Sequence, residues 1–402
     1  MTARLEAPAA APSVSAETRK TAAKRSIFEE VSEPRQDAPQ GGMIAAGGRG
    51  GARGAIRIWL AVLFAMVVAM IAVGGLTRLT DSGLSITEWR PVTGALPPMD
   101  AAGWEAEFEK YRQSPEFKLQ NHTMTIDEFR GIYWWEWGHR QLGRAVGLVW
   151  AAGFLGFWLL RRIPAGWHLR LALPGLLGGV QGALGWWMVA SGLTGRMVDV
   201  ASYRLALHLG LAFVILGLLA WLILRLGRPE AALIQARRSG DAALARRAGW
   251  LAALTFLQIL LGALVAGIDA GRGFPTWPSM NGSFFPADAF YLAEGEPAWR
   301  SFFENPGLVQ FTHRMVGYLV FGFGLYVWFR ARRSAHPVTR MAFDWMAAML
   351  LGQIVLGIVT VLHAAPLHLA LVHQLGAVIL WVMILRAAFL SRYPVIRSIR
   401  GS

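Results

Sequence analysis

Eight long apolar segments, each about the length that crosses a bilayer, constrain the fold of this chain more than any other feature. Charged residues make up only 16% of the 402 residues, against about a quarter in a soluble domain. A lipid core requires roughly 20 consecutive apolar residues in a helix. The sequence therefore predicts an all-α polytopic membrane protein. The expected spans are 57–77, 135–160, 171–190, 204–225, 249–268, 308–329, 342–363 and 370–390.

The positive charge of the chain, +14 in total, alternates with these spans. The loop 78–138 holds ten acidic and six basic residues, whereas most Lys and Arg lie in other segments. Because basic residues gather on the cytoplasmic side of membrane proteins, this pattern predicts eight spans with both termini in the cytoplasm. A nucleic-acid surface would give no reason for the alternation. The basic segments are 1–57, 161–170, 225–247, 330–340 and 386–400.

The first 56 residues are rich in Ala, Gly, Ser, Pro and charge and contain no apolar run. This composition predicts a disordered cytoplasmic tail. A mitochondrial transit peptide would be poor in acids, yet six acidic residues are present here. We therefore expect a bacterial inner membrane, with a mitochondrial one as the alternative.

Cysteine is absent from the sequence. Its absence excludes disulfides, iron–sulfur clusters, covalently attached c-type haem and thiolate-ligated iron. A metal centre in this chain would have to use His, carboxylate or Met ligands.

An internal repeat divides the chain into two halves of four spans each. The segment 136–144 (EWGHRQLGR) matches 310–318 (QFTHRMVGY), so that His139 answers His313. Two further matches follow. His208 matches His373, and Gln181 and Gly185 match Gln353 and Gly357. At the ends of the first spans, Gly74-Gly75 aligns with Ala266-Gly267. Halves with an even number of spans share one orientation, which makes this a parallel repeat. The expected units are a tail 1–56, a four-helix bundle 57–225, a cytoplasmic linker 226–248, a second bundle 249–392 and a tail 393–402.

Two outer loops, 78–134 and 269–307, are long enough to hold structure of their own. The first contains Trp104, Phe108 and Tyr111 among acidic residues, which predicts a short amphipathic helix lying at the membrane interface. The second is rich in Gly, Pro and Phe, which is typical of an irregular packed loop.

Four histidines occupy matched positions near the outer ends of the even-numbered spans: His139, His208, His313 and His373. Neutral imidazole is a common metal ligand, and two histidines from facing helices suit a haem inside a four-helix bundle. A zinc site would need three or four close ligands. A single histidine at a helix end is more often an interfacial or hydrogen-bonded residue, but four matched copies favour ligation.

Glu136 is a carboxylate that the repeat does not keep, because its counterpart is Gln310. Glu136 lies three residues before His139 and therefore shares its helix face. From there it could donate or accept a proton at a bound substrate, and we predict it to be the catalytic residue. A plain ion pair with Arg140, four residues on, is the structural alternative. Gln310 retains the shape and hydrogen bonding of the residue without its charge.

Five arginines lie near the outer ends of spans and could pair with haem propionates through bidentate hydrogen bonds. Interfacial positions of long basic side chains explain them equally well. The five are Arg78, Arg140, Arg144, Arg204 and Arg314.

Several of these motifs together resemble one known family. The segment 74–85 (GGLTRLTDSGLS), Glu136-x-x-His139-Arg140, the segment 266–271 (AGIDAG) and the segment 276–280 (TWPSM) are similar to the signatures of haem A synthase. The resemblance runs from about residue 57 to 392, and the motifs occur in the family's order.

The resemblance implies an eight-span duplicated enzyme that oxidises the C8 methyl of haem O to the formyl group of haem A by successive hydroxylation, for cytochrome oxidase. It implies that His313 and His373 ligate a haem b cofactor, that His139 and His208 bind the iron of the substrate haem, and that Glu136 is catalytic. Expected partners are the bilayer, a haem O synthase and an unidentified electron donor; association into a homo-oligomer is left open. Some members of the family carry a cysteine pair in the first outer loop. This chain lacks it, and in this respect it resembles the alphaproteobacterial and mitochondrial forms.

Two other functions fit parts of the pattern. A two-haem b-type electron carrier without substrate conversion would show the same repeat and the same histidines, but would have no need of Glu136. A transporter would explain the parallel repeat but not the matched histidines.

Overall fold

The computed structural model describes residues 50–194, 197–291 and 296–396. Helices are the main regular structure of these ranges, which contain one isolated β-bridge between Met280 and Ser283 and no β-strand. The predicted all-α class is confirmed. The long helices are α1 Gly50–Leu79, α4 Ile126–Leu159, α5 His168–Gly192, α6 Ser202–Leu226, α8 Ala242–Gly267, α11 Pro306–Ala331, α12 Pro337–Leu362 and α13 Leu367–Arg392. The short ones are η1 Thr93–Ala95, α2 Ala101–Arg112, α3 Pro115–Leu119, α7 Glu230–Arg238, α9 Ala270–Gly273, η2 Ala298–Arg300 and α10 Ser301–Glu304.

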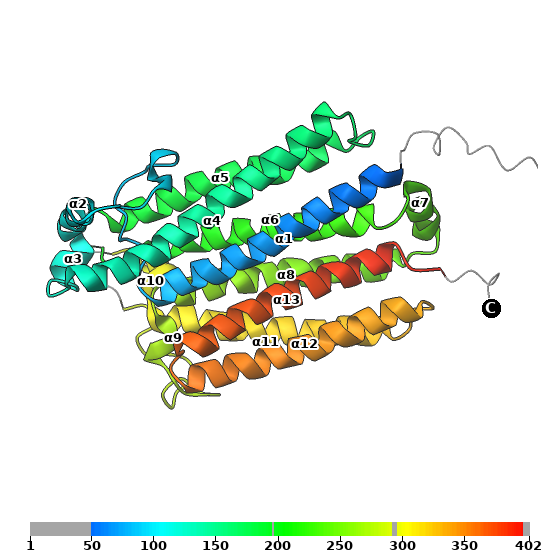
Figure 1. Cartoon of the computed structure of the whole chain (residues 1–402). Coiled ribbons are helices and arrows are strands. Elements are labelled where there is room, and N and C mark those ends of the chain that lie inside the picture. Colours follow the sequence, from blue (N-terminus) through cyan, green and yellow to red (C-terminus); the bar gives the residue numbers. More distant parts are fainter. Residues whose placement is uncertain (1–49, 195–196, 292–295, 397–402) are drawn as a thin grey trace, which may run out of the picture. The chain divides into compact units, whose positions relative to one another are not determined.

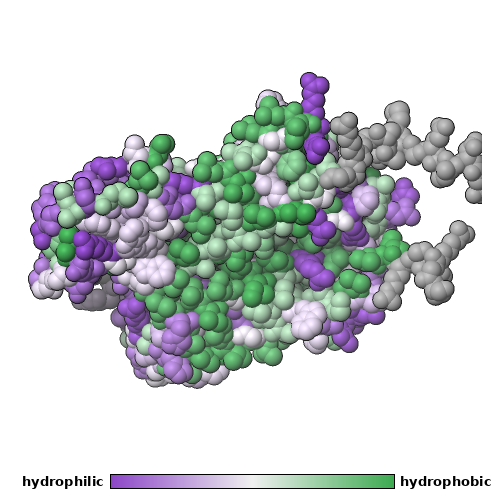
Figure 2. Space-filling view, in the orientation of Figure 1, coloured by the Kyte–Doolittle hydropathy of each residue, from purple (hydrophilic) through white to green (hydrophobic). Residues whose placement is uncertain are grey.

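Six of the long helices, α1, α4, α6, α8, α12 and α13, have the length and apolar composition of membrane spans. Helices α5 and α11, with 25 and 26 residues, are as long as α6, α8, α12 and α13. Figure 2 shows apolar side chains gathered over the middle of the helices and hydrophilic ones toward their two ends. Large apolar side chains such as Leu148, Leu176 and Leu319 are exposed on the long helices, as expected for a protein that contacts lipid. The chain is therefore a multi-pass helical membrane protein.

Helices α1, α6, α8 and α13 lie in the middle of the described residues, and α6 and α13 each contact the other three. Helices α4 and α5 pack on α1 and α6, and helices α11 and α12 pack on α8 and α13 (Figure 1). The apolar core lies between the middle helices, where Leu216, Leu251 and Ile384 are almost fully buried. The indole of Trp381 donates to the carbonyl oxygen of Phe213 at 3.0 Å and so joins α13 to α6 inside this core.

The start of α1, the end of α13 and helix α7 lie at one end of the helices, and α2, α3, α9 and α10 lie at the other (Figure 1). Arg53 donates to the carbonyl oxygens of Arg225 and Arg228, and Arg228 in turn donates to those of Tyr393 and Pro394. The basic start of α1, the segment between α6 and α8, and the residues that follow α13 therefore meet at the same end.

Several boundaries differ from the sequence prediction. Helix α1 begins at Gly50, inside the segment expected to be a disordered tail, and α4 begins at Ile126, well outside the predicted span. The extension of α4 is stable because a capping box at Thr125 and Glu128 satisfies its first backbone groups. The predicted linker 226–248 contains α7 and the first turns of α8. The remaining expected tails, 1–49 and 397–402, lie outside the described residues.

Helix α2 exists as predicted, but its apolar face is not at the membrane interface. Trp104, Phe108 and Tyr111 are buried against Phe129 and Tyr133 on the outward extension of α4. The sequence showed an amphipathic helix without showing its partner. The partner is α4, because α4 continues beyond the apolar span that the sequence marks.

Candidate functional site

Each of the four predicted histidines faces a glycine on a neighbouring long helix. A Cβ atom added to any of these glycines would lie closer to the imidazole Cε1 than an ordinary van der Waals contact. Any other residue at these positions would therefore push the ring away. The pairs, with the distance from the added Cβ to Cε1, are His139 with Gly74 (3.3 Å), His208 with Gly185 (2.9 Å), His313 with Gly262 (3.1 Å) and His373 with Gly357 (3.1 Å). The matched histidines therefore occupy matched cradles.

The histidines are also brought together in pairs. His139 and His208, from α4 and α6, lie within electrostatic reach of each other, as do His313 and His373, from α11 and α13. Among the described residues no three His, Asp or Glu side chains converge as they would around a bare metal ion. Two imidazoles from different helices are the ligand set that a haem iron takes in a helical bundle.

Three of the histidines are accompanied by a glutamine from the neighbouring helix. Its Nε2 donates to the backbone carbonyl of the histidine and lies between 3.1 and 3.3 Å from a ring nitrogen. Its Oε1 is buried and has no partner among the described residues. The glycines leave space beside the imidazole rings, and the three Oε1 atoms remain free to accept hydrogen bonds. Both features fit a site that holds a planar haem next to the imidazoles. The glutamines are Gln181 beside His208, Gln258 beside His313 and Gln353 beside His373.

Gln258 and Gly262 were missed by the sequence comparison. Gly74-Gly75 was set beside Ala266-Gly267, whereas the glycine that faces the histidine in the second half is Gly262, one helical turn earlier. The available signal was the spacing: a glutamine four residues before a glycine, as in Gln181 and Gly185.

Glu136 is buried and has hydrogen bonds to both of its oxygens. Oε1 accepts from Arg140 at 2.6 Å and 3.1 Å, and Oε2 accepts from the Ser85 hydroxyl and the Ile86 backbone N–H, both at 2.7 Å. Arg140 also donates to the carbonyl oxygens of Ile86 and Glu88. The predicted ion pair with Arg140 is thus present. It fixes the start of the first outer loop over the helix turn that carries His139.

Gln310 occupies the corresponding place in the second half. It is as buried as Glu136, accepts from Arg314 at 2.7 Å and donates to the carbonyl oxygen of Ala270 at 2.8 Å. Arg314 donates to the carbonyl oxygen of Phe274, as Arg140 does to that of Ile86. The same frame is therefore built twice, once around a carboxylate and once around a neutral amide.

The other predicted arginines have partners within the protein. Arg144 donates to the carbonyl oxygens of Arg90 and Pro91 in the first outer loop. Arg204 donates to the carbonyl oxygen of Trp187 at 2.6 Å and stacks over its ring. These contacts position loops and helix ends. A guanidinium group has five N–H donors, so each arginine still has N–H groups available to a ligand.

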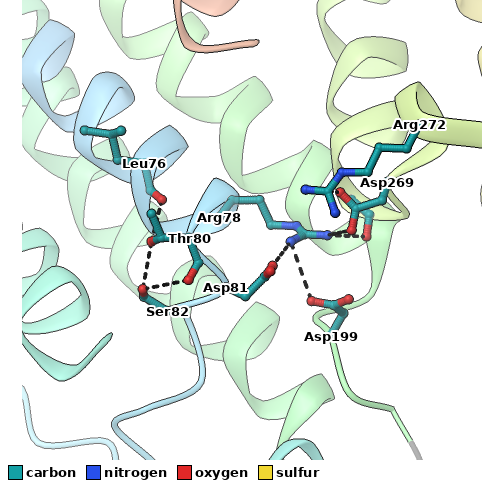
Figure 3. Close-up of polar contacts among 9 residues, drawn as sticks. Leu76, Arg78, Thr80, Asp81, Ser82, Asp199, Asp269 and Arg272 are labelled. Carbon is teal, nitrogen blue, oxygen red and sulfur yellow. Dashed lines mark hydrogen bonds and ion pairs between the residues drawn. The ribbon is translucent and has the colours of Figure 1, made fainter. Parts of the chain in front are cut away.

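Arg78 at the end of α1 lies among carboxylates (Figure 3). It donates to Asp81 at 2.7 Å and Asp269 at 3.1 Å and lies 3.7 Å from Asp199, while Arg272 lies 3.6 Å from Asp269. Burial raises the pKa of Asp199, with Arg78 opposing and Asp81 and Asp269 adding to the rise. Because Asp269 follows α8, Arg78 ties the end of α1 to the second half of the chain.

Glu116 on α3 is a buried acid that the sequence did not reveal as special. Its side chain is 3% exposed and its Oε2 has no partner among the described residues. Burial raises its pKa to about 8, Tyr111 opposes the rise, and Asp199, Asp81 and Glu136 add to it. Burial and Glu116 in turn raise the pKa of Tyr111. A carboxyl group with this environment is protonated near neutral pH.

These features define a class of protein: a multi-pass helical membrane protein with two histidine pairs, each in glycine cradles, and with one buried carboxylate beside the first pair. The sequence profile of the cytochrome oxidase assembly protein family matches residues 57–385. The chain belongs to this family.

Proteins named haem A synthase are close relatives. The protein of Dinoroseobacter shibae is 65% identical over 381 residues, which cover 94% of this chain and 99% of the relative. Those of Ruegeria pomeroyi and Paracoccus denitrificans are 66% and 62% identical over 382 residues, with the same coverage of both chains.

Proposed function

We propose that this chain converts haem O to haem A for cytochrome oxidase, by oxidising the C8 methyl group to a formyl group through successive hydroxylation. The observation that carries the proposal is the difference between Glu136 and Gln310 inside two otherwise matched frames. A carrier of electrons would need both histidine pairs but no titratable residue beside one of them. The relatives named haem A synthase support the same reaction.

The proposed architecture has eight transmembrane helices arranged as two pseudo-symmetric four-helix bundles, residues 57–225 and 249–392, joined by the linker 226–248. The contacts of α4 and α5 with α1 and α6, and of α11 and α12 with α8 and α13, support two groups of four. Halves with an even number of spans share an orientation, as in a parallel repeat. The basic segments at one end support cytoplasmic termini and a bacterial inner membrane.

The C-terminal bundle would hold a haem b cofactor, with His313 and His373 as its ligands. The glycine cradles of Gly262 and Gly357 and the orphaned Oε1 atoms of Gln258 and Gln353 support this fit. When bound, this group would supply one-electron transfer between a donor and the substrate site. The role of the chain is to fix both imidazole rings and to keep water out.

The N-terminal bundle would receive haem O between His139 and His208. Glu136 would accept the proton released at the substrate, because its helix turn places it beside His139. Arg140 and the Ser85 hydroxyl hold the carboxylate in position before substrate arrives. Arg78, Arg140, Arg144, Arg204 and Arg314 are candidates for the propionates of the two haems.

The proposed partners follow from this chemistry. Haem O must be delivered by a haem O synthase, and successive hydroxylation requires an external oxidant such as dioxygen together with an electron donor. The bilayer provides the route for an apolar substrate. Contact with further copies of the chain remains a proposal that the size of the purified protein would test.

Haem analysis of membranes tests the function directly. Cells that lack the protein should accumulate haem O and contain no haem A, and the gene supplied in trans should restore haem A. Haem A in the lacking strain would contradict the proposal. Purified protein that holds two haem b groups per chain, from cells that make haem O, would favour the two-haem electron carrier instead.

A further inference from the structure

Three of the four site histidines have a glutamine partner, and the fourth has none. Each glutamine lies four residues before the glycine that faces its histidine, on the same helix. Its Nε2 donates to the histidine carbonyl at 2.6 to 3.0 Å and lies close to the ring. The three sets are Gln181, Gly185 and His208; Gln258, Gly262 and His313; and Gln353, Gly357 and His373.

Met70 stands where the fourth glutamine would be. It lies four residues before Gly74, the glycine that faces His139. Its side chain also reaches the same place as that of Gln258. A Cβ on Gly143, four residues after His139, would lie 3.7 Å from Met70 Cε, and a Cβ on Gly317, four residues after His313, would lie 3.2 Å from Gln258 Nε2.

A thioether cannot replace the amide in this position. Methionine sulfur is a weak acceptor and has no N–H to donate. Within the described ranges no side chain makes a hydrogen bond to the ring or the carbonyl of His139. Hydrogen bonds from outer residues fix the orientation of a ligating imidazole, and their loss weakens binding about 10- to 100-fold.

We propose that Met70 is a positioning residue that leaves His139 as the displaceable ligand of the substrate haem, while Gln181 keeps His208 fixed. This inference rests on the proposed function, in which one haem stays bound and the other must leave after each turnover. The displaceable side is also the side of Glu136, which lies one turn before His139 on α4 and is held there by Arg140. Movement of His139 would open the haem face toward the carboxylate.

The difference can be reversed by exchanging the two residue types. Met70→Gln would give His139 the amide that the other histidines have, and Met70→Leu would keep an apolar side chain of similar size. Gln258→Met is the reciprocal change in the second half. Each purified variant would be loaded with haem O in the absence of oxygen, and transfer of haem to an excess of a haem-scavenging apoprotein would be followed, together with the low-spin fraction of the visible spectrum.

The parent and Met70→Leu should release one haem quickly and one slowly. Met70→Gln should slow the quick phase about tenfold and raise the low-spin fraction, and Gln258→Met should accelerate the slow phase. Equal release from Met70→Gln and Met70→Leu would overturn the proposal. If Met70→Gln does not take up haem O, Gln258→Met decides instead. An unchanged slow phase of haem release from Gln258→Met would also overturn the proposal.

Release is measured before any conversion takes place, so its result is independent of the reaction. A protein that binds two haems but forms no haem A would contradict the proposed function, while the release phases would still decide the role of Met70.

Discussion

The two halves of this protein build nearly the same site from different residues at two decisive positions. In the C-terminal half, both residues are neutral amides: Gln258 donates to the His313 carbonyl, and Gln310 accepts from Arg314. In the N-terminal half, Glu136 and Met70 replace them, which adds a charge and removes a hydrogen-bond donor. The frame of helices, glycine cradles and arginine-anchored loops is retained. In the proposed function the fold supplies two binding sites, and these few side chains would assign one to retention of its haem and the other to reaction.

The largest expected effect comes from making the halves alike at the carboxylate. Glu136→Gln should reduce conversion of haem O about 10²- to 10⁴-fold, the usual contribution of a general acid or base, and leave haem content unchanged. Gln310 shows that an amide fits this frame and accepts from the arginine. The measurement is haem A per milligram of membrane protein.

Asp127→Asn, which neutralises an exposed carboxylate on the same helix, is the control for this change, and it should leave conversion near the parent level. Equal haem A from Glu136→Gln and the parent would remove the catalytic role from Glu136 and leave its ion pair with Arg140 as a structural feature.

Replacing a cradle glycine by alanine should produce the next largest effect. Each substitution should weaken haem binding only in the half of the chain that contains it. Gly357→Ala should weaken binding of the cofactor haem about tenfold or more, and Gly185→Ala should do the same to the substrate haem, because each added Cβ lies close to an imidazole. Haem-to-protein ratios after purification, resolved by haem type, check both.

Gly352→Ala and Gly182→Ala, on the same two helices, add a Cβ that meets nothing within 4 Å. Both should retain haem, and alanine in the helix should if anything raise the melting temperature. Haem loss in these controls would show that any alanine in the helices disturbs the sites.

Ser85→Ala removes one of the hydrogen bonds that hold Glu136, and Gly273 is the corresponding residue of the second half. A hydrogen bond to a charged group contributes about 1.5–3 kcal/mol, so conversion should fall about tenfold without loss of haem. Single-turnover conversion with bound haem O is the suitable measurement. A conversion rate equal to the parent's would mean that Arg140 and the Ile86 N–H alone position the carboxylate.

The outer loop of the N-terminal half also contains Glu116, and its raised pKa predicts a dependence of stability on pH. The pKa of Glu116 is raised to about 8 in the folded chain, against about 4.3 in an unfolded chain. Between these values the folded chain holds a proton that the unfolded chain releases. The free energy of unfolding should therefore fall as the pH rises through this window, by at most about 1.4 kcal/mol per pH unit, and change no further above it.

Glu116→Gln should flatten this slope and raise the melting temperature near pH 8 but not near pH 4, as followed by thermal unfolding in detergent. Glu109→Gln, an exposed carboxylate on α2, should leave the slope unchanged. A slope that is identical in Glu116→Gln and the parent would assign it to other groups.

Much of the fold could be predicted from the sequence, because apolar length and charge alternation are strong signals in a membrane protein. All eight expected apolar segments lie in long helices, and the matched histidines lie in matched cradles. The outward extension of α4 and the burial of α2 could not be predicted, since Phe129 and Tyr133 look like loop residues until Trp104 and Phe108 are placed against them.

Within the candidate site, the histidines and the contrast between Glu136 and Gln310 could be predicted from sequence alone. Gln258 could have been found from its spacing to Gly262, which equals that of Gln181 to Gly185. Met70 could not be predicted, because the first spans of the two halves share few identical residues and the sequence comparison sets them one helical turn out of register. Only the contacts of Gly74 and Gly262 with their histidines fix the register and reveal which residues correspond.

The most direct test replaces the histidines of one half at a time and measures which haems the purified protein carries, and how many. It asks whether the C-terminal half retains the cofactor and the N-terminal half binds the substrate. Protein purified from cells that make haem O should carry one haem b that is lost in His313→Ala and His373→Ala but kept in His139→Ala and His208→Ala, and haem O or haem A should show the opposite pattern. Haem b that disappears with the N-terminal histidines, or haem A that forms without them, would contradict the account.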